Sequence, residues 1–278
     1  MSERFSALAA NWVRFPGGDE DVSEPTPAWP LEAVLDGVAA AGFAAAGLDH
    51  YTTAAHGRVD DLGAMLDARG LRCTDVGVLP IGERGIVEAA HRLAHTASAT
   101  GATLCIAAFY APAPDPVQDL RAAAEILADA GVRLALEFTA YGDLRSLSSA
   151  SELCAAVGWE RCGVLVDTWH FFRGGEPWPL LCRLRGDQIA LVHVNDGAPA
   201  SDIDPVFEGR FRRLPPGAGT FAIDRFAEAI DATGYDGPIS VEVLSTELRR
   251  RAPEEAARIL HRSLARSRWS ALDRRRYP

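Results

Sequence analysis

The chain has 278 residues, a formal net charge of −10 and a hydrophobic content of 48%, which is the composition of an ordinary globular protein. A negative surface repels phosphate backbones, so this charge disfavours general nucleic-acid binding. No apolar window approaches the roughly 20 residues that cross a bilayer, and the first residues lack a secretory signal pattern; we therefore expect a cytoplasmic protein that contacts neither nucleic acid nor membrane.

Eight apolar runs recur along the chain and predict β-strands that are buried on both faces. Several of their ends lie about thirty residues apart, which is the length of one strand–helix unit. The runs occupy residues 5–11, 44–49, 72–79, 103–109, 132–138, 162–167, 189–195 and 238–244.

Helices are predicted between these strands from their start and stop residues. Asp115 is expected to cap a helix that begins at Pro116, and Ser149 is expected to cap the next one. A later helix is expected to begin at Pro253, where two acidic residues in the first turn suit the helix dipole. Most of these segments end on glycine, which readily terminates a helix.

Eight such units in about 250 residues predict a fold of the α/β class, a single (β/α)8 TIM barrel. A doubly wound sheet would carry a G-x-G-x-x-G turn after its first strand, where this chain reads NWVRFPGGDED. We expect one domain over residues 1–278, with a short basic tail at about 268–278 that is solvated or contacts another subunit. The long loop 196–219 is expected to be functional or mobile.

Several cofactor chemistries are excluded by residue types that the chain lacks. All 28 basic residues are arginine, so no lysine is available for a Schiff base, for pyridoxal phosphate or for a P-loop. The five cysteines are odd in number and form no C-x-x-C pair. A disulfide framework and a zinc ribbon are therefore both disfavoured.

Four consecutive predicted strands end in residues that can bind a metal. They are Glu137, Asp167, His193 and Glu242. In a TIM barrel the carboxyl ends of the strands surround one mouth, so these side chains are expected to converge there. Gathered carboxylates would repel one another, and a divalent cation removes that cost. Three carboxylates and one imidazole suit one Mn²⁺ ion best, with Mg²⁺, Co²⁺ or Zn²⁺ as alternatives.

The segments LALEF, LVDTWHFFRGG, LVHVND, LPPGAGTFAIDRF and ISVEV carry a family resemblance. The chain resembles the xylose isomerase-like TIM-barrel superfamily, specifically the sugar phosphate isomerases/epimerases. The resemblance implies one divalent ion bound by Glu137, Asp167, His193 and Glu242, with Glu137 and Glu242 as the catalytic pair on opposite sides of the substrate. It also implies that His170 contacts a substrate hydroxyl or carbonyl.

The expected reaction is isomerisation or epimerisation of a ketose or keto-cyclitol through a metal-stabilised enediolate. The same site also allows elimination, so a lyase acting on a keto-inositol, dehydroshikimate or keto-glycoside is the alternative. A non-catalytic sugar-binding barrel is a more remote one. A DNA-repair endonuclease of the same superfamily is disfavoured, because no histidine follows His193 before His261.

Further substrate-binding candidates come from the ends of the first two strands and from the long loop. Trp12 and His50, with Asn11, are expected at the same mouth, unless His50 is a simple loop histidine. Arg213, with Arg210 and Arg212, is a candidate for clamping a phosphate or carboxylate, the alternative being a solvated charge run. A core histidine is likewise the alternative for His170. The aromatic residues of WHFFRGGEPWP are expected either to line the substrate pocket or to belong to the core. As a separate expectation, two copies of the chain form a homodimer.

Overall fold

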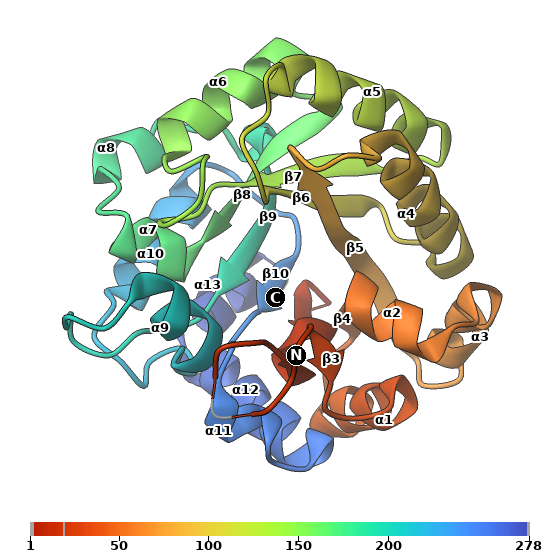
Figure 1. Ribbon diagram of the computed structural model, residues 1–278. Helices are drawn as coiled ribbons and strands as arrows, with labels where there is room; N and C mark the ends of the chain where they lie inside the picture. Colours follow the sequence, from red (N-terminus) through yellow and green to blue (C-terminus); the bar gives the residue numbers. More distant parts are fainter. Residues whose placement is uncertain (1–2, 19, 277–278) are drawn as a thin grey trace.

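Eight parallel strands form a closed barrel in the computed structural model, which describes residues 3–18 and 20–276 (Figure 1). Each of the eight apolar runs overlaps one of these strands, so the predicted (β/α)8 barrel is confirmed. Neighbours in the chain are neighbours in the barrel, and the last strand pairs with the first. The strands are β1 (Phe5–Leu8), β4 (Ala45–Asp49), β5 (Arg72–Ile81), β6 (Leu104–Phe109), β7 (Arg133–Glu137), β8 (Cys162–Asp167), β9 (Ile189–Val194) and β10 (Ile239–Val241).

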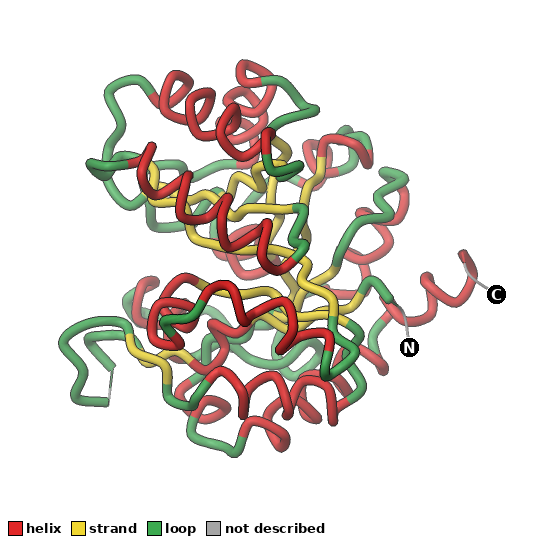
Figure 2. The backbone as a smooth tube through the Cα atoms, turned by 90° about the vertical axis from the view of Figure 1, so that its right-hand side faces the viewer, coloured by secondary structure: helices red, strands yellow, loops and turns green. Residues whose placement is uncertain are grey.

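Helices surround the barrel and cover its outer face, as Figures 1 and 2 show from two directions. Larger hydrophobic residues fill the layer between strands and helices, while a smaller cluster that includes Leu8, Ile106 and Leu165 lies inside the barrel. Inward and outward side chains alternate along each strand. The helices are α1 (Leu31–Ala41), α2 (His50–His56), α3 (Leu62–Asp67), α4 (Ile86–Thr100), α5 (Pro116–Asp129), α6 (Leu147–Val157), α7 (Thr168–Arg173), α8 (Trp178–Leu181), α9 (Pro205–Phe211), α10 (Ile223–Ala232), α11 (Thr246–Arg249), α12 (Pro253–Arg266) and α13 (Arg268–Arg276).

Two of the three predicted helix starts are confirmed. The Asp115 side chain accepts a hydrogen bond from the backbone N–H of Gln118, and α5 begins at Pro116; α12 begins at Pro253. The prediction for Ser149 is wrong, because Ser146 caps α6 and accepts the backbone N–H of Ser149. The helix starts earlier because Leu147, in its first turn, is fully buried in the hydrophobic core.

The basic tail begins as a packed helix. Trp269 and Leu272 in α13 are buried, and Trp269 stacks edge-on against Phe226 of α10. The backbone N–H of Arg268 donates to the Asp224 carboxylate. The first residues of the predicted tail are therefore not solvated, because their apolar side chains cover the outer face of α10 and α12. Residues 277 and 278 lie outside the described part.

The long loop after β9 is folded around a buried carboxylate. Asp196 accepts hydrogen bonds from the backbone N–H groups of Gly197, Gly217, Gly219 and Phe221, at 2.8–3.0 Å. Two backbone bonds between Asp196 and Leu214 close the loop, which also contains α9. In the described part of the chain, no helix combines the length and the apolar character that crossing a membrane requires.

Candidate metal centre

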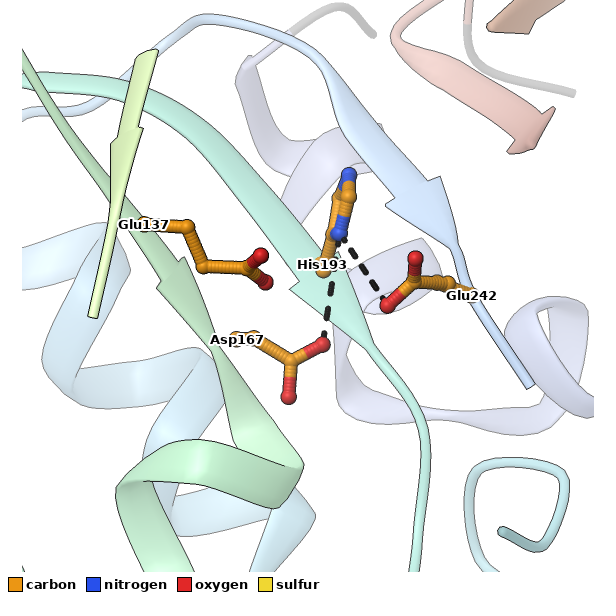
Figure 3. Close-up of side chains that lie close together, drawn as sticks. All are labelled: Glu137, Asp167, His193 and Glu242. Carbon is orange, nitrogen blue, oxygen red and sulfur yellow. Dashed lines mark ion pairs between the residues drawn. The ribbon is translucent and has the colours of Figure 1, made fainter. Parts of the chain in front are cut away.

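The four predicted strand-end residues converge inside the barrel mouth (Figure 3). Glu137, Asp167, His193 and Glu242 each offer one ligand atom, and these atoms all lie within 4.8 Å of one another. Nδ1 of His193 lies 3.5 Å from Oε2 of Glu242 and 4.0 Å from Oδ2 of Asp167. The convergence follows from strand register, since Asp167 and His193 are paired positions on adjacent parallel strands.

Asp167 is held by three donors from different parts of the chain. Its Oδ1 accepts the backbone N–H of His170 and so caps α7. Its Oδ2 accepts bonds from the amide of Asn195, at 2.9 Å, and from the guanidinium of Arg213, at 3.1 Å. A fully buried carboxylate needs such partners to remain charged. The acid at the end of this apolar strand therefore both starts a helix and enters the cluster.

Asn11 holds the strand segment that carries Glu242. Its side-chain amide donates to the carbonyl of Val241 at 2.9 Å, and its side-chain oxygen accepts the N–H of Val243 at 2.6 Å. These two backbone groups flank Glu242 on either side. Asn11 is 2% exposed, so its role in the structure is to fix the backbone of β10 and the segment that follows it.

Replacing Asn11 with alanine is expected to destabilise the protein by about 2–4 kcal/mol, because two buried backbone groups lose their partners. The orientation of Glu242 is expected to loosen, which weakens metal binding in addition. Urea unfolding and a metal titration measure the two effects. Asn11→Asp is the matched variant, since it keeps an acceptor for Val243 and removes the donor to Val241. Wild-type stability in Asn11→Ala would contradict this reading.

The charges of the cluster shift its pKa values in opposite directions. Burial raises the pKa of Glu137 to about 8, and the negative charges of Glu242 and Asp167 add to that effect. Burial alone would raise the pKa of Glu242, but Arg213 and then His193 lower it to about 2. Burial alone would lower the pKa of His193, but Glu242 and the other carboxylates raise it to about 9. Without a metal ion, protons therefore compensate part of the negative charge.

The metal-free protein is expected to lose stability as the pH rises from about 6.5 to about 9, the interval between the unfolded and folded pKa values of His193. A raised pKa stabilises the fold fully below the unfolded value, and this stabilisation disappears above the folded value. Glu137 has a raised pKa as well and acts with the same sign up to about pH 8. A metal ion should displace these protons, so its affinity should rise over the same interval.

Calorimetric metal titrations in buffers with different ionisation enthalpies measure the number of protons released. Metal affinity that is independent of pH between 6.5 and 9, with no proton release, would contradict the expected linkage.

A cavity of about 580 Å³ opens above the cluster and is lined by Glu137, His193 and Glu242. This volume is in the ordinary range for small-molecule sites. A larger hollow on the outer surface lies between the segment 215–225 and α12, and it contains none of the four cluster residues. Aromatic side chains that we did not predict form much of the cavity wall: Phe15, Tyr51, Phe109, Tyr110 and Tyr141. Phe109 is the last residue of β6 and the others follow the end of a strand, which is the sequence signal that could have identified them.

His170 lines the cavity as a neutral hydrogen-bond donor. Its Nδ1 accepts the backbone N–H of Ala140 at 3.1 Å, so the proton of the neutral ring lies on Nε2. Burial lowers the pKa of His170 to about 4. The Nε2 atom lies 3.8 Å from Oε1 of Glu137. The ring can therefore donate to a substrate oxygen next to that carboxylate.

The remaining predicted substrate contacts have different outcomes. Trp12 is 1% exposed, belongs to the hydrophobic core and does not line the cavity, because its side chain packs outside the barrel. His50 also does not line it, although Asp49, Tyr51 and Val78 around it do; its Nδ1 accepts the N–H of Val78. The aromatic side chains Trp169, Phe171, Phe172 and Trp178 belong to or pack against the core.

Arg213 enters the cluster itself, whereas its two neighbours on the loop do not. Its NH1 atom lies 2.8 Å from Oε2 of Glu242 and 3.1 Å from Oδ2 of Asp167, and its Nε donates to the carbonyl of Gly209. Arg210 lines the cavity, and the exposed Arg212 does not. The bridge between Arg212 and Ser245 brings this part of the loop against the segment that follows β10.

Comparison with known families agrees with this arrangement. The model of a family described as xylose isomerase-like TIM barrel matches residues 35–266. The chain belongs to the xylose isomerase-like TIM barrel family. This family membership and the closed barrel confirm the resemblance and the fold expected from the sequence.

The chain is similar to proteins named as inosose isomerases and to proteins named as 3-dehydroshikimate dehydratases. It is 29% identical over 134 residues to an inosose isomerase of Halalkalibacterium halodurans, which is 48% of this chain and 46% of the relative. It is 32% identical over 133 residues to a 3-dehydroshikimate dehydratase of Pseudomonas aeruginosa, which is 47% of this chain and 21% of the relative. The match thus spans about half the length of the first relative and about a fifth of the second.

A solved structure of the same shape is the crystal structure of an IolI protein with a bound zinc atom. It superposes with a TM-score of 0.79 at 18% identity and covers 94% of this chain and 96% of that one. At this identity the likeness concerns the fold. In this member of the xylose isomerase-like family, three carboxylates and an imidazole whose Nδ1 has no hydrogen-bond partner among the described residues form a donor set that fits a single divalent ion.

Proposed function

We propose that this protein is a divalent-metal-dependent isomerase or epimerase of a ketose or keto-cyclitol. The observation that carries the proposal is the convergence of Glu137, Asp167, His193 and Glu242 beside a cavity large enough for a sugar ring. Similarity to inosose isomerase, over 48% of this chain, supports the substrate class.

Glu137 and Glu242 are the proposed catalytic pair. They enter the cluster from opposite sides, Glu137 from the end of β7 and Glu242 from the end of β10 (Figure 3). One carboxylate removes the proton next to the substrate carbonyl, and the other returns a proton to the opposite face, which is epimerisation. If the proton returns instead to the former carbonyl carbon, the carbonyl moves by one position: a ketose deprotonated at its terminal carbon becomes an aldose, and a keto-cyclitol becomes an isomeric keto-cyclitol.

The four residues would hold one divalent ion, which supplies Lewis-acid polarisation of the substrate carbonyl when bound. Manganese is our first choice because oxygen donors predominate, and zinc is the first alternative to test. His170 donates its Nε2 proton to a substrate oxygen near Glu137. Arg213 neutralises part of the carboxylate charge.

A lyase is the second candidate, and two observations favour it. The 32% identity to 3-dehydroshikimate dehydratase is one. The other is that Arg145 and Arg210 line the cavity without a carboxylate partner among the described residues, so a substrate carboxylate would find positive charge there. The same proton removal followed by departure of a β-hydroxyl, which takes up the proton as water, gives elimination.

The test is incubation of metal-loaded protein with ketoses, inososes and 3-dehydroshikimate in D₂O, followed by NMR. Incorporation of deuterium at the carbon next to the carbonyl, together with a new epimer or aldose, is the expected result. Loss of water from a carboxylated substrate would instead establish the lyase. Tight sugar binding with neither exchange nor elimination would identify a non-catalytic binding barrel and overturn both enzymatic proposals.

A further inference from the structure

A second group of buried polar side chains lies inside the barrel, next to the proposed metal centre. Side chains alternate along each strand, so the inward positions two residues before Glu137, Asp167, His193 and Glu242 form the next level of the interior. Ala135, Leu165 and Leu191 fill this level on three strands, as expected for a packed barrel. On three other strands this level is polar. It contains Ser240 on β10, Ser6 on β1 and Asp75 on β5, and all three residues are fully buried.

Asp75 is directed into the barrel interior. Its Oδ2 accepts the hydroxyl of Thr74 at 2.6 Å, while its Oδ1 has no hydrogen-bond partner among the described residues. A Cβ atom at Gly47 would lie 2.5 Å from Oδ1 of Asp75 and 2.7 Å from a methyl group of Leu8. The missing side chain of Gly47 therefore provides the space that the carboxylate occupies between β4, β5 and β1.

Three further buried polar atoms lack a hydrogen-bond partner, as Oδ1 of Asp75 does. The hydroxyl oxygens of Ser6 and Ser240 and the Nε2 atom of His193 have no hydrogen-bond partner in the described part of the chain. Ser6 pairs with Ser240, and Ser240 pairs with His193, in the register of three adjacent strands. In Figure 3 the His193 ring turns one nitrogen toward Asp167 and Glu242 and the other away from them.

The carboxylate of Asp75 and the His193 ring are also within electrostatic reach. Burial raises the pKa of Asp75, and the charge on His193 is the largest influence that lowers it. Polar groups buried in this way cost free energy unless they are paired, and a small polar compartment with two to four partners is where proteins bind internal water.

We propose that Asp75 is a positioning residue for His193, acting through an internal water molecule that it shares with Ser6 and Ser240. The water accepts the Nε2 proton of His193 and donates to Oδ1 of Asp75. The ring is then fixed in the tautomer that leaves the Nδ1 lone pair facing Asp167 and Glu242. Carboxylates commonly orient metal-binding histidines in this way. The inference rests on the metal centre of the proposed function.

Metal titration of Asp75 variants tests the proposal. Asp75→Leu removes the acceptor and is expected to weaken the binding of Mn²⁺ or Zn²⁺ by about 10–100-fold, the usual effect of losing such a partner. Asp75→Asn keeps an acceptor oxygen without the charge and should have a smaller effect. Leu120→Ala, a buried change on α5 outside the barrel interior, is the control for general destabilisation and should leave metal affinity unchanged.

A second measurement observes the wild-type protein directly, and a variant is needed only to assign the signal. Nitrogen-15 NMR of the wild-type protein, loaded with diamagnetic Zn²⁺, reports which His193 nitrogen carries the proton; a His193→Gln sample assigns the signal. A protonated Nε2 in slow exchange with solvent is expected. A metal bound to Nε2, or an unchanged affinity in Asp75→Leu, would overturn the inference. If the wild-type protein binds no divalent ion at all, the proposed function itself fails, and the two failures are thereby distinguished.

Discussion

Replacing Glu242 with glutamine is expected to lower the rate of deuterium exchange by about 10²–10⁴-fold for the epimer whose proton Glu242 removes, the usual contribution of a positioned acid or base. The substitution keeps the size of the side chain and its hydrogen-bonding capacity but removes the proton acceptor. The charge that Arg213 and His193 compensate is also lost, so metal binding should weaken. The exchange rate must therefore be measured at saturating metal, with the affinity determined separately.

The Glu137→Gln variant makes the same test on the other side of the cluster. For an epimerase, each variant should abolish conversion of one epimer into the other, while exchange of a single epimer with solvent persists through the remaining carboxylate. Glu176→Gln is the matched control, because Glu176 is buried but does not belong to the cluster or line the cavity. Wild-type exchange of both epimers in Glu242→Gln at saturating metal would exclude its catalytic role.

Replacing Arg213 with methionine is expected to destabilise the metal-free protein by about 3–5 kcal/mol, because it leaves buried carboxylates without their countercharge. Arg213 is 2% exposed and bridges Asp167 and Glu242. A divalent ion should compensate for the loss, since it binds the same oxygens and stabilises the folded state by mass action. Metal affinity should be higher in this variant than in the wild-type protein, because a competing positive charge has been removed.

Urea unfolding with a chelator and with saturating metal measures both parts of this expectation. Arg212→Met is the matched control: Arg212 is adjacent, exposed and outside the cluster, so its loss should change stability by no more than about 0.5 kcal/mol. Equal stability of the two variants without metal would show that Arg213 is not the countercharge of the cluster.

The metal-binding candidates were predictable because they depend on local features of the sequence. A strand that is buried on both faces is apolar, so a carboxylate or histidine at its end is conspicuous. In a parallel barrel all these ends meet at one mouth, and Glu137, Asp167, His193 and Glu242 accordingly lie together. The helix capped by Asp115 was predictable for the same reason, as a cap acts within one turn.

Contacts between segments that are distant in the chain were harder to predict from the sequence. Trp12 and His50 have the right place in the strand–helix order, but side-chain direction in the short turns after a strand depends on packing, and neither lines the cavity. The sequence placed Asn11 at the barrel mouth, whereas its two hydrogen bonds around Glu242 depend on the closure of the barrel between β1 and β10. Ser149 failed as a cap because burial of Leu147 extended the helix.

The sequence by itself determined the barrel, its eight strands and the residue types at the strand ends, because these follow from hydrophobic periodicity and short-range turn chemistry. Only the tertiary structure decided that Arg213, on the long loop after β9, reaches into the cluster, and that Asp75 and His193 are buried inside the same barrel. Both depend on which side chains share a buried, weakly screened space, where charges that are far apart in the chain act strongly on one another.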